Sequence, residues 1–140
     1  MPTREQAVDV IYGTFNTAWS TNPTYPVVWP NKKPEAEVMK QGNPWAFVRI
    51  AHGNGKQRTL SGADGTKLWQ RRGQFICEIS AQSGTGADQA NDLAELVEAA
   101  FRGKTISGVA FRGIQSREGG MRGNWFLVTV TVDFEYDEIV

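Results

Sequence analysis

The most regular hydrophobic pattern lies at the C-terminal end of the chain, in the segment NWFLVTVTVDFEYDEIV. Apolar and polar residues alternate there from Trp125 to Glu135, which is the period of a β-strand with one buried face. One face would carry Phe126, Val128, Val130, Val132, Phe134 and Tyr136. The other changes from apolar at Trp125 to acidic at Asp133 and Glu135. We therefore expect a long central strand whose acidic end projects beyond the core.

Two other segments show the spacing of amphipathic helices, with apolar residues three and four positions apart. The first extends from Thr3 to Ser20, and its Thr3 and Gln6 have the spacing of a capping box. The second lies within SGTGADQANDLAELVEAAFRGK, where Gly103 is expected to cap its end. Gly13 interrupts the first helical pattern, which indicates a close contact with another backbone.

Further strand patterns follow one another along the chain. Val27 to Trp29 lie between two prolines, which cannot donate to a sheet ladder, so this strand should lie at an edge. The segment WAFVRIAH alternates and is predicted to form a hairpin with residues 56–61 across the turn Gly53-Asn54-Gly55. Residues 67–81 form a long strand, in which Gly73 indicates a bulge or a bend.

Two polar stretches are predicted to be loops. Residues 31–43 are one, and loops of this length in compact domains are often functional. The other, QSREGGMRGN, would join a short strand over residues 106–112 to the C-terminal strand. Strands thus follow strands and do not alternate one-for-one with helices. This order indicates an α+β fold in one domain over residues 1–140, a mostly antiparallel mixed sheet with two helices packed on one face.

The overall charge narrows the classes of function. The 140 residues include 15 basic and 15 acidic side chains, so the formal net charge is zero. Proteins that bind nucleic acid through its phosphates usually carry a basic excess, whereas zero charge removes one barrier to self-association. The chain has no run of 18 apolar residues, and its N-terminal sequence lacks the features of a signal peptide. We expect no membrane span, and a protein that stays in the compartment that makes it.

The residue types needed for catalysis are scarce. His52 is the single histidine, and without it no serine or cysteine triad and no histidine-rich metal site can be built. Cys77 is the single cysteine and lies in an apolar run, which is typical of a small buried hydrophobic residue. The glycines of SGTGADQ are compatible with an anion site at a helix start, or simply with a turn. We expect no enzyme activity, no metal and no cofactor.

Aromatic and charged residues make binding surfaces the main candidates. Trp29 on its edge strand, and Trp69 beside Arg71 and Arg72, are candidate interface anchors because tryptophan and arginine are enriched at interfaces. Arg71 and Arg72, like the arginines in residues 112–122, are also compatible with single-stranded nucleic acid. We favour a contact with an acidic face of another copy of this chain.

Acidic residues gather in two places that suit such contacts. Asp88, Asp92, Glu95 and Glu98 lie on the second helix opposite its apolar stripe, as a solvated face or as a subunit contact. Asp137 and Glu138 lie at the end of the C-terminal strand. We expect these last two carboxylates to meet a basic patch on a neighbouring molecule, which adds them to the candidate interface residues.

The order of these elements and motifs carries a resemblance that covers nearly the whole chain. The matching motifs are Trp45 to Arg49 (WAFVR), Arg71-Arg72-Gly73, Gly84-Thr85-Gly86 before a helix that ends in Phe101-Arg102-Gly103, and Trp125 to Glu138 (WFLVTVTVDFEYDE). Together with an N-terminal helix and a proline-rich segment, they make the chain resemble the tail-terminator-like proteins of long-tailed bacteriophages and prophages. Each motif alone is weak, and the order and spacing carry the likeness.

The resemblance implies a structural virion protein and not an enzyme. Such a protein would form a ring, as a homohexamer, that caps the head-proximal end of the tail tube, ends tube polymerisation and offers a surface for head–tail joining. The implied partners are further copies of the chain, the tail tube protein and the head–tail connector protein, with DNA only passing through the lumen non-specifically.

The implied location is the phage tail, after assembly in the cytoplasm of the bacterial host. Alternative functions are a head–tail connector, another minor tail component, or a small-ligand binding module unrelated to phages.

Overall fold

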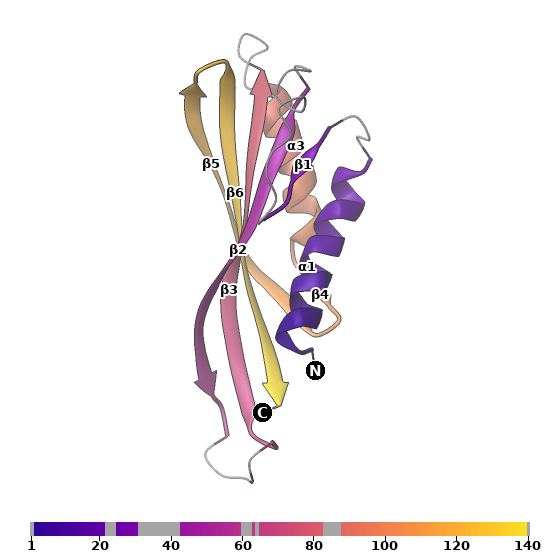
Figure 1. Ribbon diagram of the computed structural model, residues 1–140, viewed down its shortest axis with the longest axis vertical. Helices are drawn as coiled ribbons and strands as arrows, with labels where there is room; N and C mark the ends of the chain where they lie inside the picture. The colour runs from indigo at the N-terminus through magenta and orange to yellow at the C-terminus, as the bar shows by residue number, and fades with distance from the viewer. Residues whose placement is uncertain are drawn as a thin grey trace.

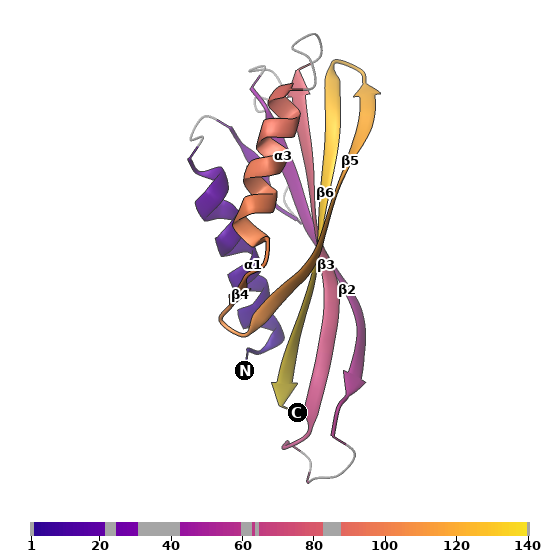
Figure 2. The same cartoon turned by 180° about the vertical axis from the view of Figure 1, so that it is seen from behind.

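A computed structural model describes residues 2–21, 25–30, 43–59, 63, 65–82 and 88–139. Within these residues two helices lie beside one six-stranded sheet, and the helix bounds are α1 (Arg4–Trp19) and α3 (Asp88–Phe101). The strands are β1 (Val27–Val28), β2 (Trp45–Gln57), β3 (Leu68–Gln82), β4 (Thr105–Ile106), β5 (Val109–Arg122) and β6 (Trp125–Ile139). Both helices lie on the same side of the sheet (Figures 1 and 2). The predicted α+β class is confirmed.

The sheet has the strand order β1-β2-β3-β6-β5-β4. Its first pair, β1 with β2, is parallel, and all the other neighbouring pairs are antiparallel. The strand β6 lies between β3 and β5, so the alternating C-terminal segment forms a central strand, as predicted. The proline-fenced strand β1 lies at an edge, which is also as predicted, since neither of its flanking prolines has to donate to the ladder.

The N-terminal helix begins as its sequence predicts. The Thr3 backbone N–H donates to the Gln6 side chain at 3.0 Å, and the Gln6 N–H donates to the Thr3 hydroxyl at 3.2 Å, which completes the capping box. The expected close contact at Gly13 is wrong, because a Cβ added there would have no atom within 4 Å. This glycine lies on the exposed side of α1, away from the sheet.

The core lies between the helices and the inner face of the sheet, the face that the helices cover. Inner-face residues of β6 and their β3 partners are almost all buried, and they include Phe75, Cys77, Ile79, Val128, Val130, Val132 and Phe134. From α3, Phe101 reaches this layer and contacts the rings of Phe75 and Phe111, with centroid distances of 5.3 and 4.8 Å. Cys77 is fully buried, which confirms its expected place in the core.

Two predicted connections are instead parts of strands. The hairpin turn at Gly53-Asn54-Gly55 is wrong, because β2 continues to Gln57 with a register shift between His52 and Gly55. The neighbouring strand β3 supplies partners past the glycines, so they form an irregularity in the ladder. Gly73 is correspondingly in regular pairing with both neighbours, and the bulge predicted there lies on β2.

The polar segment QSREGGMRGN is also mostly strand. Except for its last two residues, it belongs to β5, which runs to Arg122 and pairs with β6 along its length. An edge strand tolerates polar residues because much of it faces water. The polarity of this segment was therefore not sufficient evidence for a loop. Of the expected loop over residues 31–43, only Asn43 is described, and the glycine turn at residues 84–86 lies outside the described residues.

The close packing at Gly73 predicts a stability difference between two glycines. A Cβ on Gly73 would lie 2.6 Å from Phe134 Cζ and 2.7 Å from the Ala51 carbonyl oxygen. Gly73→Ala should therefore lower the free energy of unfolding by about 1–3 kcal/mol, which denaturant titration measures. The matched control Gly13→Ala should raise it by up to about 1 kcal/mol, because it improves an exposed helix position. Equal effects of the two changes would contradict this packing.

The buried Cys77 predicts a thiol that reacts only after unfolding. Burial, and next the charge of the adjacent Glu78, raise the pKa of the Cys77 thiol, so the reactive thiolate is scarce in the folded protein. A chromogenic disulfide reagent should label Cys77 at the rate of unfolding, and promptly in denaturant. Labelling at the rate of a free thiol under native conditions would contradict it.

Candidate functional site

The ends of β2, β3 and β6 extend past the start of α1 and form a projecting arm (Figure 1). We use this name for residues 53–57, 68–72 and 135–139. Five of the six candidate interface residues lie on this arm, namely Trp69, Arg71, Arg72, Asp137 and Glu138. The predicted projection of the acidic end of the C-terminal strand is therefore seen in the structure.

The acidic end of β6 has partners within its own chain. Glu138 accepts a hydrogen bond from Arg71 Nε at 2.8 Å, and Asp137 accepts one from Arg58 at 2.9 Å. Because both carboxylates are neutralised here, they do not need a basic patch elsewhere to be stable. Their contact with a neighbouring subunit stays a prediction.

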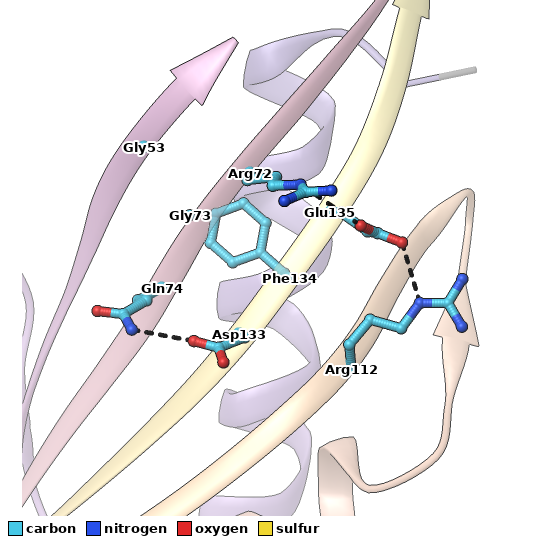
Figure 3. A pocket seen from close by; sticks show the side chains of 8 residues that line it. All are labelled: Gly53, Arg72, Gly73, Gln74, Arg112, Asp133, Phe134 and Glu135. Atoms are coloured by element: carbon cyan, nitrogen blue, oxygen red, sulfur yellow. Dashed lines mark hydrogen bonds and ion pairs between the residues drawn. The ribbon is translucent and has the colours of Figure 1, made fainter. Parts of the chain in front are cut away.

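A carboxylate missed at the sequence level links two strands across the outer face of the sheet, which is the face away from the helices. Glu135 accepts a hydrogen bond from Arg112 Nε at 3.0 Å and lies 3.8 Å from Arg72 Nε (Figure 3). Beside it, Gln74 donates to Asp133 at 3.0 Å. The β6 alternation already put Glu135 on the outer face, but only the strand register brings the arginines of β3 and β5 to it.

These side chains line an open groove of about 460 Å³. Its lining residues are Gly53, Arg72, Gly73, Gln74, Arg112, Asp133, Phe134 and Glu135. Both carboxylates of the groove already accept hydrogen bonds, so neither is a free general base. The Arg72 and Arg112 side chains remain 67% and 71% exposed, so they stay available for a polar contact with a partner. The groove is thus suited to recognition.

The aromatic candidates are packed within the chain. The Trp29 ring lies edge-on to Tyr12 and Phe15, with centroid distances of 5.5 and 6.1 Å, and is half-buried against α1. Trp69 covers Gly55 so closely that a Cβ there would lie 2.1 Å from its Nε1. Both rings therefore have structural partners, and their function as interface anchors stays a prediction.

Neither the pKa of His52 nor the arrangement of potential metal ligands marks a second candidate site in the described residues. Burial, then the charges of Arg4 and Arg71, lower the pKa of His52, so its neutral form is favoured. Within the described ranges no group of three potential metal-ligating side chains occurs, and no helix is long and apolar enough to cross a membrane.

The geometry thus defines a small α+β protein with an extended sheet and a surface suited to contacts with other macromolecules. The model of the family described as phage tail terminator protein matches residues 10–134, and the chain belongs to this family. The resemblance in the sequence is thereby confirmed, and the protein is a structural component of a phage tail.

Two further comparisons complete this result. No curated protein matches the chain. One solved structure shares 19% sequence identity with it at a TM-score of 0.63, over 95% of this chain and 97% of that chain. At this identity the likeness concerns the fold alone.

The ion pairs of Glu135 predict a measurable contribution to stability. Glu135→Gln keeps the shape of the side chain but removes the charge between Arg72 and Arg112, so the two guanidinium groups repel each other. We expect the free energy of unfolding to fall by about 1 kcal/mol at low salt, and by less at 1 M salt because of screening.

A matched control tests whether removing an exposed acidic residue elsewhere lowers the free energy of unfolding by as much. Glu95 pairs with Arg102 at 3.1 Å, and both side chains are mostly exposed. Glu95→Gln should change the free energy of unfolding by less than about 0.5 kcal/mol. If Glu135→Gln is no more destabilising than this control, the charge network does not stabilise the arm.

Proposed function

We propose that this protein caps the head-proximal end of the tail tube as a ring, ends tube polymerisation and provides the surface for head–tail joining. The observation that carries the proposal is the family match over residues 10–134, together with an α+β fold that covers the same segment. The ring is a homohexamer, and its partners are the tail tube protein and the head–tail connector protein. DNA passes through the lumen without sequence recognition.

The open edges of the sheet support assembly with other chains. Beyond Phe47, β2 has no strand on its outer side among the described residues, and neither has β5 after Ala110. Such edges present unpaired backbone donors and acceptors on which another chain can dock. Both edges also carry charged side chains, which limit uncontrolled pairing and favour a specific partner.

The two unlike faces of the molecule support a closed ring. One side of the molecule is the helix layer, and the other is a sheet face that no helix covers (Figures 1 and 2). A contact between unlike surfaces, repeated around an axis, generates a ring when the rotation closes. The zero formal net charge of the chain places little long-range repulsion between subunits.

Capping predicts a direct effect on the length of tail tubes. When purified tail tube protein from the same phage polymerises in the presence of this protein, tubes should be shorter than in its absence. Negative-stain images should show a ring with a central hole at one tube end, because the cap occludes the growing surface. An unrelated α+β protein of equal size serves as the control.

Two outcomes would contradict this function. If tube length does not change and no ring binds the tube ends, the protein is not a terminator. If it binds the purified connector protein but never the tube, the alternative function of a connector component is favoured.

A further inference from the structure

The half of the outer sheet face that lies away from the arm forms a surface of aromatic and basic residues. Cross-strand partners point to the same side of a sheet, and successive rows alternate between sides. The rows on the outer side here are Trp45–Ser80–Leu127, Phe47–Glu78–Thr129–Arg117, Arg49–Ile76–Thr131 and Gln82–Trp125–Arg122. The intervening rows, such as Ala46–Ile79–Val128, are buried under the helices. We call this surface the tryptophan face.

The centre of the tryptophan face is apolar, although no described element covers it. Trp45 and Trp125 contact each other edge to face with a centroid distance of 6.0 Å, and the side chain of Phe47 is 36% exposed. Beneath the two indoles, Leu127 and Ser80 are buried. Trp45 and Trp125 are half-buried and Phe47 is exposed. Partly accessible aromatic rings gathered on one face are typical of a protein interface.

Three arginines surround this apolar centre. Arg49, Arg117 and Arg122 are exposed and lie on the same side of the sheet as Trp45 and Trp125. None of the three forms an ion pair within the described part of the chain. Their charges therefore stay available for a partner.

The opposite side of the molecule carries the complementary charge. Asp88 and Asp92, four positions apart on α3, and Glu5 and Asp9 on α1 are exposed in the helix layer. No ion pair is formed by any of the four within the described residues. Figure 2 shows both helices on one side of the sheet, and the strand register puts the tryptophan face on the other side.

We propose that the tryptophan face of one copy docks on the acidic helix layer of the next copy, and that this is the repeated contact of the ring. The proposal rests on the proposed function and names the surfaces that close the ring. Arginines of one copy would meet unpaired aspartates of the next, while the indoles lose their contact with water. Opposite sides of one slab then form a single heterologous interface.

Duplex DNA is the other polyanion that a basic face can meet. A second copy fits better, because DNA phosphates would leave the tryptophan cluster unused. The helix layer, by contrast, supplies both the acidic side chains and the side-chain surface of a neighbouring protein.

Charge reversal tests the contact without touching the core. The variant Arg117→Glu/Arg122→Glu makes both surfaces acidic, and Asp88→Arg/Asp92→Arg makes both basic. Each should weaken assembly by about tenfold or more, because like charges then face each other. Light scattering of the purified protein, alone and with tail tube protein, measures assembly.

Mixing the variants gives the decisive result. In an equimolar mixture, the acidic tryptophan face of one variant meets the basic helix layer of the other, so alternating rings should form. A single chain with all four changes should also assemble. The control Lys104→Glu also makes the chain more acidic, but it lies after α3, outside the tryptophan face and the open sheet edges, so its assembly should match that of the unchanged protein.

Each other outcome overturns a defined part of the reasoning. If the unchanged protein is monomeric both alone and on tubes, the ring itself fails, and this interface with it. If it forms rings and Arg117→Glu/Arg122→Glu does so equally well, the interface is wrong while the ring stands. If that variant keeps its rings but loses retention of duplex DNA, the tryptophan face meets DNA instead.

Discussion

The rest of the structure depends on the unbroken antiparallel pairing of β3 with β6. Every residue from Leu68 to Gln82 has a partner between Trp125 and Ile139. A strand of 15 residues reaches about 50 Å, whereas the 14 residues of α3 reach only about 21 Å. A helix layer of this length cannot cover strands of that length. The core therefore occupies one part of the sheet, and the remaining part projects as the arm.

No helix covers the arm, and its arginines pair with carboxylates on the neighbouring strand. These pairs are Arg71 with Glu138 and Arg72 with Glu135. Exposed ion pairs contribute little singly, and a set of them along one ribbon mainly holds the strands in register. The arm is thus internally neutralised, while the upper outer face of the sheet keeps unpaired charges. This contrast favours an assembly contact on the outer face with unpaired charges, and not at the arm residues that the sequence identified as interface candidates.

Several features were predictable because they depend on neighbours in the chain. The capping box of α1 uses two residues three positions apart, and the faces of β6 follow from strict alternation. The connections were less predictable. Gly53 and Gly55 indicate a turn when β2 is considered alone, yet the length of β3 decides that the strand continues. The polar residues 115–122 resemble a loop, yet β6 supplies a partner along their length.

The sequence by itself determined the class of the fold, the buried face of the C-terminal strand and, through the order of its motifs, the family. These features depend on periodicity and on interactions between residues that are close together in the chain, so they can be recognised from the sequence alone. Only the tertiary structure decided which charges are paired within the chain and which face outward unpaired. The pairing of Glu135 with Arg72 and Arg112 requires the register of three strands, since residues far apart in the chain meet only when the sheet is built.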